Sequence, residues 1–219
     1  MNSFIVPAEA RFLVLGSKAV GKSALTVRFL TKRFIGEYQS LMQLTYNHTI
    51  KLDDENLTFD IRDAIEKGDV SQVDKDIRWA DAFLVVYSIT DKKSFNNAIQ
   101  LVEAIYDGKG TDELHVALVG NKRDLEHFRK VTTKEGKSAA EQLGCMFFEV
   151  SAAENYDNVQ QALNVVFRKV SLHKKYLRQE KEKRKNSNPQ IEKKKQKFGN
   201  SLFNWKNEKK RSPRRAETP

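Results

Sequence analysis

The chain has 219 residues, one cysteine and a formal net charge of +10. A single cysteine excludes a disulfide framework, and no apolar run is long enough for a transmembrane helix or a secretory leader, so we expect a cytoplasmic or nuclear protein. Residues 170–219 carry 17 Lys and Arg against 5 Asp and Glu, which leaves a net charge of −2 for the rest of the chain. We therefore expect a nearly neutral domain over residues 1–176 and a basic, disordered tail over residues 177–219.

Strand-like apolar runs alternate with longer segments along the predicted domain. The runs lie at residues 11–15, 46–52, 57–62, 82–89, 115–120 and 146–150. The acidic residues 53–56 are expected to join the second run to the third as a hairpin turn. The last helix carries apolar side chains at helical spacing, at Val159, Leu163, Val166, Phe167 and Val170. This alternation predicts an α/β fold with a mostly parallel six-stranded sheet and helices on both faces.

A glycine-containing loop lies between the first strand and the first helix. It matches the pattern G-x-x-x-x-G-K-[ST] through Gly16, Ser17, Lys18, Ala19, Val20, Gly21, Lys22 and Ser23. The backbone N–H groups of such a loop surround a polyphosphate, and the helix that follows points its positive end at the anion. We expect Lys22 to place its charge on the outer phosphates and the Ser23 hydroxyl to ligate Mg²⁺.

A second motif follows the buried-strand run at residues 116–120. It contains Asn121, Lys122 and Asp124, at the carboxyl end of a strand, where α/β sheets bind ligands. A carboxylate at that place can accept hydrogen bonds from two adjacent N–H groups, which guanine offers and adenine does not. Asp124 is therefore predicted to select guanine, and the expected ligand is GTP or GDP with Mg²⁺.

Together these motifs resemble those of the Ras superfamily of small GTP-binding proteins over about residues 10–170. The sequence Ser151-Ala152-Ala153 is similar to the family's S-A-K loop over the guanine, and Phe34 falls where the family stacks an aromatic ring on the base. Asp63 matches the family's aspartate that holds Mg²⁺ through water. The resemblance implies a P-loop small GTPase fold, a monomer, protein effectors, and base contacts from Phe34, Asn121, Lys122, Asp124, Ser151 and Ala152.

Within the superfamily, residues 27–38 and 79–81 are most similar to the branch of the Ras-related, oestrogen-regulated growth inhibitor and its Ras-like relatives. The segments that this resemblance aligns with the family's switches depart from the pattern. Leu41 stands where a threonine closes on Mg²⁺ and the γ-phosphate, and Glu66 and Lys67 replace a glycine and the water-positioning glutamine. Lys18 also replaces a loop glycine. We expect slow hydrolysis and weak switching, with Lys67 as the one candidate for a substitute catalytic cation.

The tail and the altered switches leave other readings open. The main alternative is a non-enzymatic pseudo-GTPase that acts as an interaction module and is targeted by its basic tail. Aromatic residues between basic clusters at residues 193–215 also suit an anionic membrane surface, a helix-binding partner or nucleic acid. Because no cysteine follows Cys145, we expect no prenyl anchor.

Overall fold

The computed structural model describes residues 10–34, 44–52, 55–63, 70–110, 114–154 and 156–187. The chain divides into two compact units, Met1–His173 and Lys174–Pro219. The first unit contains the sheet, all the motifs of the sequence analysis and the helices that cover them. None of the helices in the described ranges is long and apolar enough to cross a membrane.

Six strands form one sheet in the order β2-β3-β1-β4-β5-β6. Their bounds are β1 Ala10–Leu15, β2 Leu44–Leu52, β3 Glu55–Asp63, β4 Ala82–Ser88, β5 His115–Asn121 and β6 Met146–Glu149. Only the β2–β3 pair is antiparallel among these strands, and the other neighbours are parallel. The predicted mostly parallel, six-stranded sheet is confirmed. Since the central strands are parallel, their carboxyl ends lie at one edge, where the loops of the candidate site begin.

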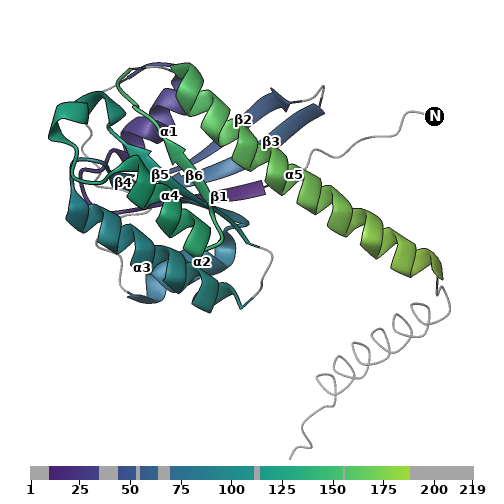
Figure 1. Cartoon of the computed structure of the whole chain (residues 1–219). Helices are drawn as coiled ribbons and strands as arrows, with labels where there is room; N and C mark the ends of the chain where they lie inside the picture. Colours follow the sequence, from purple (N-terminus) through teal and green to yellow (C-terminus); the bar gives the residue numbers. More distant parts are fainter. Residues whose placement is uncertain are drawn as a thin grey trace, which may run out of the picture. The chain divides into compact units, whose positions relative to one another are not determined.

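Helices cover both faces of this sheet (Figure 1). Their bounds are α1 Lys22–Thr31, α2 Val70–Trp79, α3 Lys92–Lys109, the 3₁₀ helix η1 Arg123–Phe128, α4 Thr133–Gln142 and α5 Tyr156–Ser187. One hydrophobic core lies between the sheet and helices α1 and α5, and it contains all five apolar residues predicted for the last helix. A second core lies between the other face and helices α2, α3 and α4.

Two boundaries differ from the sequence analysis. The predicted turn at residues 53–56 is too long, because Glu55 pairs with Leu52 and Asn56 with Lys51 inside the hairpin. Helix α5 continues to Ser187, so residues 177–187 of the predicted tail are helical. These residues are mostly Lys, Arg, Glu and Gln, which are strong helix formers, so the helix persists beyond the apolar residues that pack on the sheet. The domain boundary at residue 176 remains a prediction.

Candidate nucleotide-binding site

The phosphate loop begins directly after β1, and two of its glycines are required by the backbone. Gly16 has a φ of +142°, and a Cβ there would lie 2.1 Å from the carbonyl oxygen of Val86. Gly21 has a φ of +94°, and a Cβ there would lie 2.4 Å from Nδ2 of Asn121. Any side chain at either place would clash and strain the loop. Close packing against β4 and β5 therefore fixes the curvature predicted for a phosphate-binding loop.

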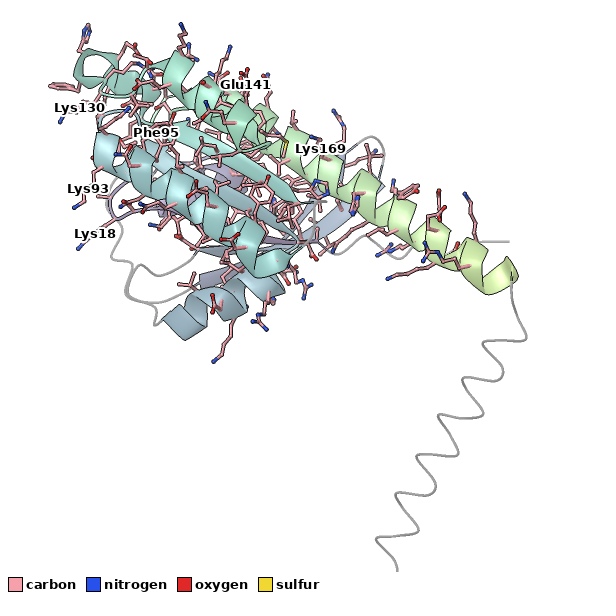
Figure 2. All side chains as sticks on the ribbon, turned by 60° about the horizontal axis from the view of Figure 1, so that its bottom comes forward. Lys18, Lys93, Phe95, Lys130, Glu141 and Lys169 are labelled. Carbon is pink, nitrogen blue, oxygen red and sulfur yellow. The ribbon has the colours of Figure 1, made fainter. Side chains whose placement is uncertain are left out.

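Lys22 is the first residue of α1, and its amine lies within the loop. Nζ donates to the carbonyl oxygens of Gly16 at 2.8 Å and Ser17 at 2.9 Å. The cation is therefore held where the loop N–H groups and the amino end of α1 already favour an anion. Lys18 is exposed and points away from the domain (Figure 2). The loop thus carries two positive charges, that of Lys22 within it and that of Lys18 at its outer surface.

The predicted metal ligands lie together although they are 40 residues apart. The Ser23 hydroxyl donates a short hydrogen bond to Oδ2 of Asp63. Oδ1 of Asp63 is buried and is one of the few buried polar atoms in the described ranges without a hydrogen bond. Burial raises the pKa of Asp63, while the bond from Ser23 and the charge of Lys22 oppose that rise. A serine hydroxyl beside a carboxylate that has an unused oxygen fits Mg²⁺, which prefers oxygen ligands and keeps several waters.

Asn121 connects the phosphate loop to the loop after β6. Its Nδ2 donates to the carbonyl oxygen of Val20 at 2.9 Å, and its Oδ1 accepts from the backbone N–H of Ala152 at 3.1 Å. Lys122 adopts a left-handed backbone with a φ of 66°, and its Nζ donates to the carbonyl oxygen of Ala19 at 2.6 Å. Two consecutive residues of the second motif therefore hold the first motif in place.

Asp124 is positioned by the serine of the third motif. The Ser151 hydroxyl donates to Oδ1 of Asp124 at 2.6 Å and accepts from the backbone N–H groups of Ala153 and Glu154, each at 3.1 Å. A single hydroxyl therefore orders the loop after β6 and orients the carboxylate assigned to the base. These contacts bring the three predicted motifs together at one edge of the sheet.

Other predicted site residues are less fully placed. Phe34 is 46% exposed, and its predicted contact with the base remains a prediction. Leu41, Glu66 and Lys67 lie outside the described residues, so their predicted effects on the γ-phosphate and on water also remain predictions.

Two supports of the site were missed by the sequence analysis. The Arg129 guanidinium forms a two-pronged ion pair with Glu149 at 2.9 and 3.1 Å, and it also bonds to Glu126. This pair ties the segment after Asp124 to the end of β6, just before the Ser151 loop. Asn97 of α3 donates to the Ser17 hydroxyl at 3.1 Å. Both contacts span unrelated segments, so no local spacing in the sequence could have indicated them.

Comparisons with known proteins agree with this geometry. A model of the Ras family matches residues 11–172. The chain is 40% identical over 163 residues to the Ras-related and estrogen-regulated growth inhibitor of Homo sapiens, covering 74% of this chain and 82% of that protein. It is 39% identical over 184 residues to Ras-like protein family member 11B of Homo sapiens, covering 81% and 74%. Ras-like protein family member 11A of Rattus norvegicus is 37% identical over 178 residues. The chain therefore belongs to the Ras family and is a GTP-binding regulatory protein of the small GTPase class.

Proposed function

We propose that this protein binds GDP and GTP together with Mg²⁺, hydrolyses GTP slowly and discriminates weakly between the two nucleotides. The observation that carries the binding is the Asn121 side chain, which bonds to both the phosphate loop and the Ala152 loop. That arrangement prepares the phosphate and base subsites before any ligand arrives. A preorganised site loses less conformational entropy when the ligand binds, which favours high nucleotide affinity.

Each group has a separate role in the proposed complex. The loop N–H groups and Lys22 bind the phosphates, and Asp124, oriented by Ser151, accepts from the base. Mg²⁺ would be held by Ser23 and, through water, by Asp63, where it would neutralise phosphate charge. The short bond between Ser23 and Asp63 would then be replaced, with both side chains turned to the ion and its waters.

Slow hydrolysis follows from the residue types in the two switch segments. Leu41 offers no side-chain oxygen to the ion, and Glu66, which aligns with a glycine of the family, would bring a carboxylate near the anionic phosphates. Lys67 cannot orient an attacking water as a glutamine amide does. These substitutions favour a protein that retains its nucleotide, so the pseudo-GTPase interaction module stands as the second candidate function.

Nucleotide extracted from the purified protein tests both candidates. The proposal expects one guanine nucleotide per chain, exchangeable for added GTP in the presence of EDTA and retained when Mg²⁺ is restored. Permanently bound GDP that does not exchange would favour the interaction module. Absence of guanine nucleotide, with no binding by calorimetry, would contradict the proposed nucleotide binding and favour an interaction module that holds no nucleotide. A Lys22→Met variant, which removes the loop cation without changing the fold's core, serves as the matched negative control.

We further propose that the basic tail makes reversible contact with anionic surfaces. Residues 188–219 carry ten Lys and Arg against three acidic residues, with Phe198, Phe203 and Trp205 between the basic clusters. Basic residues near an anionic bilayer each contribute up to about 1 kcal/mol at low salt. Single-stranded nucleic acid would be attracted by the same charge, so competition between the two ligands distinguishes them.

A further inference from the structure

We infer that Arg62 is a positioning residue that couples the metal-side carboxylate of Asp63 to helix α2, so that binding of Mg²⁺ and nucleotide is sensed at Trp79. This inference deepens the proposed function and rests on it. Arg62 belongs to none of the motifs in the sequence, yet its guanidinium contacts helix α2 and strand β2, and its backbone adjoins Asp63 in β3.

The first contact is with helix α2. Nη1 of Arg62 donates to Oδ1 of Asp76 at 2.7 Å, and the two side chains are 23% and 5% exposed. An ion pair this enclosed is only weakly screened by solvent. The same guanidinium lies 3.8 Å from the ring centroid of Trp79, one turn further along α2. The stack and the ion pair together hold the carboxyl-terminal half of α2 against the sheet.

The second contact is with the neighbouring strand. Nε of Arg62 bonds to the hydroxyl of Thr45 at 3.3 Å, and these residues are opposite each other in the β2–β3 pair. Thr45 is the second residue of β2 and belongs to residues 38–46, which align with the family's first switch, and α2 begins at Val70, after residues 63–67, which align with the second. One side chain therefore joins the strand in which the first predicted switch segment ends to the helix that follows the second.

The third link runs through the backbone to the metal side. Arg62 and Asp63 are consecutive in β3, so their side chains point to opposite faces of the sheet. Their register partners agree: Arg62 pairs with Leu13, which belongs to the core under α2 and α3, and Asp63 pairs with Val14, which belongs to the core under α1 and α5. In this inference, a shift of the β3 backbone that accompanies movement of the Asp63 carboxylate toward an ion is passed to the guanidinium on the other face, which contacts Asp76 and Trp79.

The first experiment uses tryptophan emission. The chain contains two tryptophans, so a Trp205→Phe background leaves Trp79 as the only one. We expect Trp79 emission to change when Mg²⁺ is removed by EDTA from protein loaded with GDP, and to recover when Mg²⁺ is restored. Identical emission with and without Mg²⁺ would overturn the inference, without the need for any Arg62 variant.

The second experiment measures release of a fluorescent GDP analogue as a function of Mg²⁺ concentration. In Arg62→Met we expect the concentration of Mg²⁺ that half-maximally slows release to rise about tenfold, as when residues that orient a metal ligand are lost. The release rate in EDTA should stay close to that of the parent. Arg62→Lys, which keeps the charge but not the planar fork, should lie between the two.

Arg11 provides the matched control, because it also contacts Trp79 and also pairs with an aspartate. Its guanidinium lies 5.7 Å from the ring centroid of Trp79 and 3.2 Å from Asp81, but it comes from β1 and is not adjacent to Asp63. Arg11→Met should leave the Mg²⁺ dependence unchanged. Equal effects of Arg11→Met and Arg62→Met, or faster release of the Arg62 variant in EDTA as well, would reduce Arg62 to a packing role. Failure of the parent to bind any guanine nucleotide would overturn the proposed function together with the inference.

Discussion

The carboxylate of Asp124 is half-buried, and the Ser151 hydroxyl holds one of its oxygens at 2.6 Å. In Asp124→Asn one of the two acceptor oxygens is replaced by an NH₂ group. This group is a donor and cannot accept a hydrogen bond from the guanine N–H groups. We expect GDP binding to weaken by at least about 2 kcal/mol, since donors left unpaired in a buried site cost about that much. Calorimetry with GDP gives the result, and Asp157→Asn, an exposed change in the first turn of α5, is the control. Unchanged GDP affinity in Asp124→Asn would disprove the assignment of the base subsite.

The switch substitutions are testable as a group. We expect GTP and GDP to bind with affinities within about tenfold, or about 1.4 kcal/mol, because Leu41 and Glu66 offer little that distinguishes a γ-phosphate. Hydrolysis in a single turnover should be slower than the intrinsic Ras rate, on the order of 10⁻⁴ s⁻¹. Leu41→Thr, Glu66→Gly and Lys67→Gln together should raise both discrimination and rate, whereas each alone should do little. If the parent instead hydrolyses GTP at or above the intrinsic Ras rate and Lys67→Ala loses this activity, Lys67 is catalytic.

Residues within contiguous motifs were the easiest part of the site to predict. Gly16 and Gly21 allow the tight curve of one loop and Lys22 bonds to a carbonyl within it, so their spacing in the sequence is itself the signal. Arg62 and Arg129 could not be found that way. Each acts through a partner on another element, Asp76 for the first and Glu149 for the second, and such pairs become neighbours only when the sheet forms.

Helix η1 and strand β6 are joined by the Arg129–Glu149 pair, whose side chains are only 14% and 8% exposed. Arg129→Met would leave the Glu149 carboxylate enclosed without its cation, and we expect it to lower the free energy of unfolding by about 3–5 kcal/mol. Glu126→Gln removes only the 61% exposed partner, whose interaction is screened by solvent, and should lower the free energy of unfolding much less. Urea denaturation of both variants measures the difference. Equal costs would mean that the buried pair contributes no more than the exposed one.

Helix α4 begins with a capping box in which the Glu135 side chain accepts from the backbone N–H and the hydroxyl of Thr132. The hydrogen bond from Lys92, followed by those from Thr132, lowers the pKa of Glu135 from 4.5 to about 2. Because the folded-state pKa is depressed, the stability that Glu135 supplies is present above pH 4.5 and is lost as the pH falls toward about 2.

Glu135→Gln tests this dependence. The parent should be more stable than the variant at neutral pH, and the two urea midpoints should converge as the pH falls through that window. Glu141→Gln, an exposed change near the end of the same helix, is the control and should track the parent. A difference between parent and Glu135→Gln that does not vary with pH would contradict the assignment.

Element types were well predicted because each has a strong local period. The continuous apolar residues of β4 are all buried, as expected of a central strand, and the alternation in β3 suits a strand nearer the edge. The predicted hairpin turn was too long. Consecutive acidic residues indicate that a turn is present, but they do not show which of these residues pair within the hairpin. Glu55 and Asn56 are polar and nevertheless belong to the ladder, because the pairing of strands is made by backbone groups that every residue of the turn also carries.

For the whole molecule, net charge is concentrated in the tail and not in the domain. We expect full-length protein to sediment with vesicles that contain phosphatidylserine at low salt and to be released as salt rises, because exposed charges are screened. Removal of residues 188–219 should abolish sedimentation, while neutral phosphatidylcholine vesicles provide the lipid control. Attachment that is indifferent both to salt and to this deletion would contradict tail-mediated binding. Loss of vesicle binding when oligonucleotide is added would show that lipid and nucleic acid compete for the same basic residues.

The fold class of the domain could be inferred from sequence because strand-like runs that alternate with helix-length segments are compatible with few architectures. The extent of α5 could not, since Lys, Arg, Glu and Gln have high helix propensity and are also the composition of disordered tails. Composition alone does not decide between these two outcomes.

The two hydrogen bonds of Asn121 bear on how a bound nucleotide leaves. One amide bonds to the Val20 carbonyl, in the loop proposed to bind the phosphates, and to the Ala152 N–H, in the loop proposed to lie over the base. Neither loop can open far without pulling on the other, so phosphates and base are expected to depart in one concerted step. A protein that accelerates exchange would then need to contact only one of the two loops. A small contact surface would be enough to release the whole nucleotide.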